Sequence, residues 1–341
     1  MPIPIILGGL AAAAAVTGVA KGVKGVMDNN EAKELNELAQ SIVEEAEFNL
    51  EQAKKHSQAS LELLGTAKVT ILNMSVKKFL ELFRQIKNVD FEHDGNLGNL
   101  ELTDFDVADF TMLRQEVAFV VSSGLGVAGG ATGGALAAFG AYNGVMALGA
   151  ASTGTAISTL SGAAATNATL AWLGGGSLAA GGYGIAGGTM VLGAVAAGPA
   201  MLIAGWYMGA KASKNLDDAK SNIAQAKAFK ADIDTTITAV DGIAKLAIQL
   251  KDLFHQVRVE TKKTLGELER VIASQGTDYS KYSETAKLCV MKNVKIMQLI
   301  KAMLDIAILD KGGNVLGDAQ SSIFKAKQII DNNYQGQIDN L

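Results

Sequence analysis

Two long stretches of the chain carry small or apolar residues at every seventh position, with charged and polar residues between them. In the first stretch, residues 28–88, the series consists of Ala32, Ala39, Ala46, Ala53, Ser60 and Ala67. Leu35, Ile42 and Leu63 lie three positions after members of this series. Such 3,4 alternation is typical of a coiled-coil seam, and alanine there lets two helices approach closely. The pattern predicts a helical rod, on the order of 90 Å long if uninterrupted, with Asn49 and Gly65 as candidate breaks.

The second stretch repeats this design near the other end of the chain. Its series consists of Ala212, Ala219, Ala226, Ile233, Val240, Ala247, Phe254, Thr261 and Leu268. Because both seams are rich in small residues, we expect the two rods to pair, and an antiparallel pair is the simplest arrangement. Further helices are predicted over residues 282–309 and 317–332, with a turn at 311–314. The first of these has one apolar face, formed by Val290, Val294, Met297, Ile300, Leu304 and Ile308.

Between the two rods lies a segment without a single charged residue or histidine. It spans residues 117–210, bounded by Glu116 and Lys211, and holds 23 of the 38 glycines of the chain. All charged residues lie outside it, where they make up about a quarter of the positions, as in ordinary soluble proteins. The composition therefore indicates one part that faces water and one part suited to an apolar environment.

The uncharged segment also repeats small residues at a spacing of four. The glycines in this pattern are Gly126, Gly130, Gly134, Gly140, Gly144, Gly184, Gly188, Gly205 and Gly209. In a bilayer this spacing lets helix backbones pack in direct contact. Residues 185–208 are long enough for one crossing, since about 20 apolar residues span the hydrocarbon. Trp206 and Tyr207, close to Lys211, match an interfacial aromatic belt. The segment therefore predicts a helical hairpin that inserts into a membrane.

Insertion of this hairpin is expected to be marginal. Many of its positions are Gly, Ala, Ser or Thr, which contribute little to transfer into lipid. A marginal segment can be stored in a soluble protein and released by oligomerisation or a trigger. Two alternatives remain open: a buried centre of a soluble bundle, which each glycine opposes by about 1 kcal/mol of helix propensity, and a permanent two-span membrane protein.

The N-terminal residues 1–27 form a third apolar stretch. Residues 3–19 lack a preceding Lys or Arg, and Lys21 and Lys24 follow them, which is a poor match to a secretory signal. We therefore expect a retained apolar helix and a cytoplasmic soluble form that reaches the membrane on activation. The expected division is residues 1–27, 28–116 with the first rod and an acidic loop, 117–210 with the hairpin, and 211–341.

Composition argues against several other functions. The formal net charge is -4 and no basic block occurs, so binding of nucleic acid is not expected. His56, His93 and His255 show no metal-ligand spacing, and the single Cys289 lies in an apolar helical stretch. The glycine-rich residues 174–188 lack the lysine of a phosphate-binding loop. We expect no catalysis and no small-molecule substrate.

One acidic loop resembles a calcium-binding loop. Asp90, Glu92, Asp94 and Glu101 occupy positions 1, 3, 5 and 12 of an EF-hand pattern, with Gly95 at position 6. Glu92 departs from the Asp or Asn expected at position 3. A solvated acidic loop is therefore the simpler interpretation, and calcium is the only cofactor that the sequence offers.

Three parts of the chain resemble a family of largely uncharacterised bacterial proteins with a central Gly/Ala-rich apolar hairpin. They are residues 1–9 (MPIPIILGG), 150–158 (AASTGTAIS) and the predicted hairpin turn at 161–177. The layout of charged helices around an apolar hairpin is also similar to cytolysin A type α-pore-forming toxins and to the pore-forming region of apolipoprotein L. This second similarity is architectural, and it implies oligomeric insertion without assigning a role to any residue.

The sequence thus predicts an all-α fold: an elongated coiled-coil-like helical bundle with a central Gly/Ala-rich hydrophobic helical hairpin. The predicted function is conditional, oligomeric membrane insertion that forms pores or permeabilises a membrane, as in a bacterial toxin or defence effector. Its partners would be a lipid membrane and further copies of the chain. The rival from another class is a structural helical assembly that does not permeabilise membranes.

Overall fold

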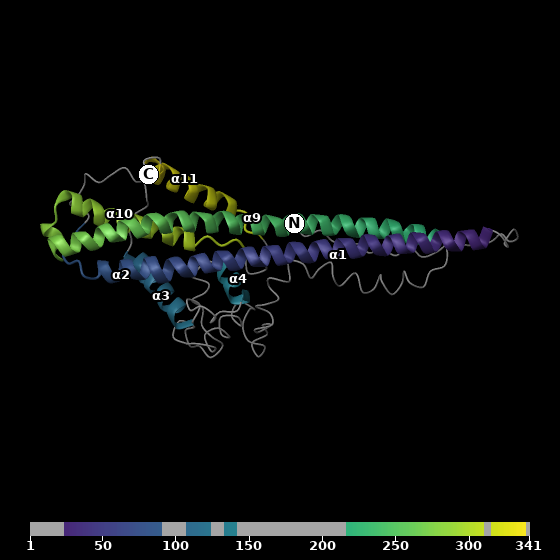
Figure 1. Ribbon diagram of the computed structural model, residues 1–341, viewed down its shortest axis with the longest axis horizontal. Coiled ribbons are helices and arrows are strands. Elements are labelled where there is room, and N and C mark those ends of the chain that lie inside the picture. Colours follow the sequence, from purple (N-terminus) through teal and green to yellow (C-terminus); the bar gives the residue numbers. More distant parts are fainter. Residues whose placement is uncertain (1–23, 91–106, 124–132, 142–215, 310–314, 339–341) are drawn as a thin grey trace. The chain divides into compact units, whose positions relative to one another are not determined.

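The computed structural model describes residues 24–90, 107–123, 133–141, 216–309 and 315–338 (Figure 1). Every regular element in these ranges is a helix, and the only bridges between extended residues there are two isolated ones. The prediction of an all-α fold is confirmed. The predicted hairpin and the N-terminal apolar helix lie largely outside the described residues, so both stay predictions.

The first rod is a continuous run of three helical elements. It consists of α1 (Lys24–Thr70), a π-helical segment η1 (Ile71–Val76) and α2 (Lys77–Phe83). Thr70, Val76 and Lys77 all have right-handed helical backbone angles, so the chain does not break at these junctions. In η1 the Lys77 N–H donates to the Leu72 carbonyl, five residues back, which is the π-helical pattern. Neither of the two candidate breaks, Asn49 and Gly65, interrupts α1.

The second rod is the single helix α9 (Leu216–Gln275), which is 60 residues long. Asp217 and Asp218 lie in its first turn, where carboxylates complement the positive end of the helix dipole. Gly276 ends the helix with a left-handed φ of 78°, and its N–H donates to the Ile272 carbonyl at 3.0 Å. The predicted second rod is therefore present as one element.

The structure divides into two compact units, and the rods run parallel in each of them. The first unit combines residues 1–46 with 202–231, and there Asn36 hydrogen-bonds Asn222 while Glu45 pairs with Lys230. The second unit combines residues 47–201 with 232–341. There the side chains of Lys78 and Glu269 form an ion pair, and the backbones of Lys87 and Asp278 form an isolated parallel bridge. In both units, positions later in the first rod contact positions later in the second rod, as in a parallel pair.

The antiparallel arrangement expected from the sequence is therefore wrong. A seam of small residues packs equally well in either direction, so it carries no information about polarity. Polar contacts between the rods distinguish the two directions, and the Asn36 to Asn222 hydrogen bond of 2.8 Å is such a contact. A parallel pair also needs a long return connection, which the residues between α2 and α9 have to supply.

The seam itself follows the predicted series with one correction. Ala32, Ala39, Ala46, Ala53 and Ser60 are buried on the first rod, and Ala67 is partly buried. All members from Ala219 to Leu268 are buried on the second rod, and Ala212 lies outside the described residues. The complementary positions on α1 lie four residues after the series, not three. They are Val43, Leu50, Ser57 and Leu64, whereas Leu63 is 55% exposed.

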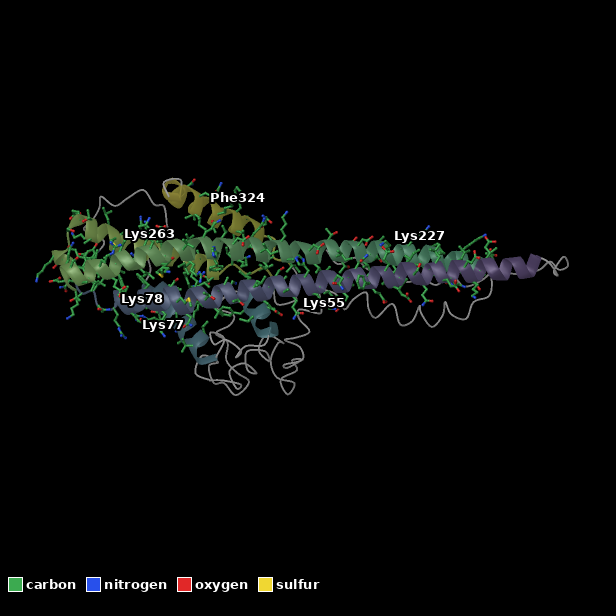
Figure 2. All side chains as sticks on the ribbon, in the orientation of Figure 1. Lys55, Lys77, Lys78, Lys227, Lys263 and Phe324 are labelled. Carbon is green, nitrogen blue, oxygen red and sulfur yellow. The ribbon has the colours of Figure 1, made fainter. Side chains whose placement is uncertain are left out.

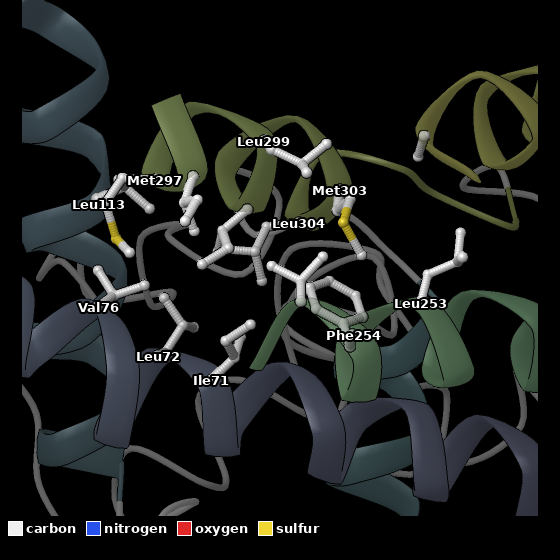
Figure 3. Packing of buried hydrophobic residues seen from close by; sticks show 14 of the residues in the cluster. Ile71, Leu72, Val76, Leu113, Leu253, Phe254, Met297, Leu299, Met303 and Leu304 are labelled. Carbon is white, nitrogen blue, oxygen red and sulfur yellow. The ribbon is translucent and has the colours of Figure 1, made fainter. Parts of the chain in front are cut away.

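The second unit gains a larger core because shorter helices cover its rods. These helices are α3 (Val107–Ser123), α4 (Gly133–Ala141), α10 (Glu284–Leu304) and α11 (Ala319–Ile338), with a 3-10 turn η4 (Tyr279–Lys281) before α10. All six residues of the predicted apolar face from Val290 to Ile308 are buried. Figure 3 shows Leu113 of α3, Val76 of η1 and Met297 of α10 gathered in this core.

Most lysines in the described ranges project away from the helices, as Lys55, Lys77 and Lys227 do in Figure 2. Lys68 and Lys301 are different, because both are buried in the second unit. Within the described ranges, no helix combines the length and the apolar character needed to cross a bilayer.

Candidate functional site

The described parts of the uncharged segment pack into the core of the second unit. They are the last turns of α3 and the whole of α4. Val120, Ala137, Phe139 and Ala141 are all less than 5% exposed and belong to the same hydrophobic cluster as the rods and α10. We call α3 and α4 together the docked segment, because the contacts that hold them on the rods define the candidate site.

Helix α3 docks through one face and places a carboxylate on it. Leu113, Glu116, Val117 and Val120 follow the 3,4 spacing of a single helical face. Leu113, Glu116 and Val120 are each at most 1% exposed. This face packs on the π-helical segment η1 of the first rod. Glu116, the last charged residue before the uncharged segment, is therefore buried by the apolar residues around it.

Helix α4 crosses α1 at a contact between two glycines. A Cβ atom built on Gly140 would lie 2.1 Å from the Leu61 carbonyl oxygen, and one on Gly65 would lie 1.9 Å from the Leu136 carbonyl oxygen. Both distances are far below van der Waals contact, so only glycine allows the two backbones to approach this closely. Gly140 thus packs a helix in this fold. Its predicted role inside a membrane stays a prediction.

The end of α4 is also tied to the segment that follows α10. The Ala141 carbonyl accepts hydrogen bonds from the N–H groups of Ile308, at 2.8 Å, and Leu309, at 3.2 Å. Leu309 in turn forms an isolated antiparallel bridge with Val315, just before α11. Docking of α4 therefore gives hydrogen-bond partners to the Ala141 carbonyl of α4 and to the N–H groups of Ile308 and Leu309.

Lys68 connects three parts of the site. Its side chain is buried, and its Nζ donates to the Gly140 carbonyl of α4 at 3.2 Å and to the Ile306 carbonyl after α10 at 3.3 Å. Burial lowers the pKa of Lys68 from its ordinary value of 10.5 to about 7, although the negative charges of Glu116 and Asp305 oppose this change. The docked arrangement thus holds the amino group of Lys68 away from water and disfavours its charged form.

Glu116 faces a second buried lysine across a long ion pair. Its Oε1 lies 3.9 Å from the Nζ of Lys301, whose closer partner is Asp305, one turn further along the chain. Neither carboxylate oxygen of Glu116 has a hydrogen-bond partner among the described residues. Burial raises the pKa of Glu116 from 4.5 to about 7, and the opposing attraction of Lys301 is weaker. We call Lys68, Glu116, Lys301 and Asp305 the buried charge cluster.

The buried charge cluster makes docking a balance of opposing terms. Burial of the apolar faces of α3 and α4 favours docking. Burial of the charged groups of Lys68, Glu116 and Lys301 opposes it, and a buried ion pair regains that cost only with close geometry and further hydrogen bonds. The 3.9 Å separation at Glu116 and its unsatisfied oxygens fall short of this.

The other predicted membrane-segment residues are distributed as follows. Gly134 belongs to α4. Gly126, Gly130, Gly144, Gly184, Gly188, Gly205, Gly209, Trp206 and Tyr207 lie outside the described residues. The role predicted for them in helix packing and insertion stays a prediction.

The calcium loop is described only at its first position. Asp90 is exposed, and Glu92, Asp94 and Glu101 lie outside the described ranges. Within the described ranges no group of three or more His, Cys, Asp or Glu side chains could hold a metal ion. Calcium binding is therefore a prediction that these residues do not test.

The residues considered for catalysis are not brought together. His56 and His255 are exposed on different rods, and His93 lies outside the described ranges. Cys289 is partly buried, and burial, with the nearby charge of Glu267, raises its pKa to about 11, which keeps the thiol protonated.

The sequence reasoning missed the buried charge cluster, although two signals for it are present. Glu116 has Leu113, Val117 and Val120 as its helical neighbours, which places a carboxylate on an apolar face. Lys301 follows Ile300 on the helix with the predicted apolar face. No sequence signal placed Lys68 beside α4, because that contact joins residues 72 positions apart.

Comparison with known proteins gave no match: neither a protein-family model, nor a curated protein, nor a solved structure is similar to this chain.

Proposed function

We propose that this protein is a conditional membrane-inserting protein, which stores the beginning of its uncharged segment on a helical bundle and releases that segment into a bilayer. The observation that carries the proposal is Glu116, a buried carboxylate without a hydrogen-bond partner among the described residues, at the start of the segment. Burial of this carboxylate costs desolvation free energy, and a contact weakened in this way is suited to reversible docking.

The uncharged segment supplies the material for insertion. Its 94 residues contain no charged side chain. This length is sufficient for at least two crossings of about 20 residues each. Its glycines at a spacing of four would let the inserted helices pack closely. Since insertion is expected to be marginal, we propose that several copies assemble and stabilise the inserted state together.

Permeabilisation of the membrane is the expected consequence of that assembly. A bacterial toxin that acts on a foreign membrane and a defence effector that acts on the membrane of its own cell both require this activity. In either role the soluble form would be cytoplasmic and the active form bound to lipid. These assignments follow from the proposed mechanism.

Dye release and flotation on the same liposomes test the proposal. The purified full chain should float with the liposomes and release an encapsulated dye. Gly140→Ala should raise the rate of release, because an added Cβ forces α4 away from α1. Gly266→Ala is the matched control, since a Cβ there meets no atom within 4 Å. Neither flotation nor release, across lipid compositions and pH, would overturn the proposal.

A charge placed in the uncharged segment provides the complementary test. Gly130→Glu should abolish dye release, because a charged side chain at the bilayer centre costs several kcal/mol. The helical content of the soluble protein should remain, as measured by circular dichroism. Unchanged release by this variant would contradict insertion of this part of the chain.

A structural assembly that never enters lipid is the second candidate, and the glycine contact favours it. The backbones of Gly65 and Gly140 meet with no room for a Cβ, as in a permanently packed core. In that case Gly140→Ala should unfold the second unit as a whole. Under the proposal, the same variant should expose α3 and α4 while α10 stays protected from hydrogen exchange.

A further inference from the structure

We propose that the buried charge cluster is a pH-sensitive latch, which holds α3 and α4 least tightly near neutral pH and more tightly in both more acidic and more alkaline solution. The role of this latch in membrane insertion rests on the proposed function. Its effect on docking does not, and can be measured without lipid.

The geometry of the cluster allows it to act on both docked helices at once. Glu116 belongs to α3, and Lys68 of α1 holds the Gly140 carbonyl of α4. The charged groups that face these two side chains are Lys301, from α10, and Asp305, at the end of that helix. From α4 and the segment after α10, the carbonyls of Gly140 and Ile306 accept hydrogen bonds from Lys68, and both are uncharged. Undocking would return Glu116 to water and free Lys68 from α4.

Glu116 makes docking stronger in acid. Its pKa is about 7 when docked, above its ordinary value of 4.5. Between these two values the docked form binds more protons than the undocked form does. A fall in pH therefore favours docking through this window, and a rise in pH weakens it.

Lys68 makes docking stronger in alkali by the same reasoning with the opposite sign. Its pKa is about 7 when docked, below its ordinary value of 10.5. Between these two values the undocked form binds more protons than the docked form does. A rise in pH therefore favours docking through this window, and a fall in pH weakens it.

The two groups together give docking a minimum near pH 7. Each limb corresponds to the exchange of at most one proton, so the ratio of docked to undocked protein changes by up to about tenfold per pH unit. Lys301 and Asp305 pair with each other and supply one counter-charge of each sign beside the two titrating groups. Neutral solution is thus the releasing condition, and acidification holds the segment in place.

Hydrogen exchange of the full chain without lipid tests the latch. The protection of α3 and α4 amides, corrected for the intrinsic exchange rate at each pH, should pass through a minimum near pH 7 and rise on both sides. Amides of α10 serve as the internal reference for global unfolding. Protection that changes in one direction only from pH 5 to pH 9 would overturn the proposal.

Two variants separate the limbs of this profile. Glu116→Gln should lose the rise in acid, and Lys68→Met should lose the rise in alkali. Glu269→Gln and Lys78→Met are the matched controls, because they alter an exposed ion pair of 2.8 Å and should keep both limbs. If a cluster variant fails to fold, as judged by α10 protection, the profile of the unaltered chain still decides. A neutral minimum without dye release would uphold the latch and overturn only the proposed function.

Discussion

The Nζ atom of Lys68 lies 3.2 Å from the Gly140 carbonyl oxygen and donates a hydrogen bond to it. This bond joins a charged rod to the backbone of the uncharged segment. Lys68 lies less than one helical turn from Gly65, where the backbones of α1 and α4 are in contact. Steric fit and buried charge therefore act at the same crossing, and substitutions can separate their effects.

The glycine contact predicts a strong effect from the smallest possible substitution. Gly65→Ala should weaken docking of α4, because the added Cβ would fall 1.9 Å from the Leu136 carbonyl oxygen and the helix would have to move away. We expect a loss of roughly 1–3 kcal/mol, the usual cost of overpacking. Hydrogen exchange of α4 amides measures it directly.

The control for this substitution lies in the second rod. Gly242→Ala adds a Cβ that meets nothing within 4 Å, and it should stabilise α9 by roughly 0.5–1 kcal/mol through helix propensity. If Gly65→Ala and Gly242→Ala had the same effect on α4 protection, the close crossing of α1 and α4 would be refuted.

Removal of the buried carboxylate should strengthen docking at neutral pH. Glu116→Gln replaces a group whose pKa burial raises to about 7 with a neutral one of similar shape. The raised pKa corresponds to a few kcal/mol against the charged form, at about 1.4 kcal/mol per pKa unit. At pH 7.5 we expect higher protection of α3 and α4 and slower dye release. Faster release would show that Glu116 stabilises the docked state.

Removal of the Lys68 donor should weaken docking in alkali, where the docked side chain is already a neutral amine. Lys68→Met keeps most of the apolar stem but leaves the carbonyls of Gly140 and Ile306 without this donor. An unsatisfied buried acceptor costs roughly 1–3 kcal/mol. We expect lower protection of α4 at pH 10 in hydrogen exchange, because at pH 7 the loss of these bonds is offset by the removal of a buried charge. An unchanged or higher protection would mean that these two hydrogen bonds contribute nothing to docking.

The parallel direction of the rods can be tested by cross-linking. Asn36→Cys combined with Asn222→Cys, in a Cys289→Ser background, should form a disulfide on mild oxidation, since the two native side chains are 2.8 Å apart. Asn36→Cys with Lys230→Cys is the control, because position 230 lies about two helical turns further along α9. Cross-linking of the control pair alone would contradict the parallel register.

Local patterns in the sequence were sufficient to predict the helices and most of their buried faces. The seven-residue series located both rods, and the spacing from Val290 to Ile308 identified the buried face of α10. These features depend on residues close together in the chain, where helical periodicity applies directly.

Features that depend on distant residues were not predictable in the same way. The direction of the rods and the offset of the seam on α1 follow from pairings such as Asn36 with Asn222, which a series of alanines does not encode. From the sequence alone Gly65 is a candidate break, because its role in close packing is visible only once α4 is known to cross it. The buried charge cluster likewise combines residues from α1, α3 and α10.

Quenching of the native tryptophans by brominated lipids tests the central claim most directly. Trp172 and Trp206 are the only tryptophans of the chain, and both lie in the uncharged segment, so their fluorescence reports on that segment alone. If the segment enters the bilayer, liposomes with bromine on the acyl chains should quench this fluorescence, and Gly140→Ala should accelerate the quenching. Protein that floats with the liposomes while its tryptophans remain unquenched would contradict insertion.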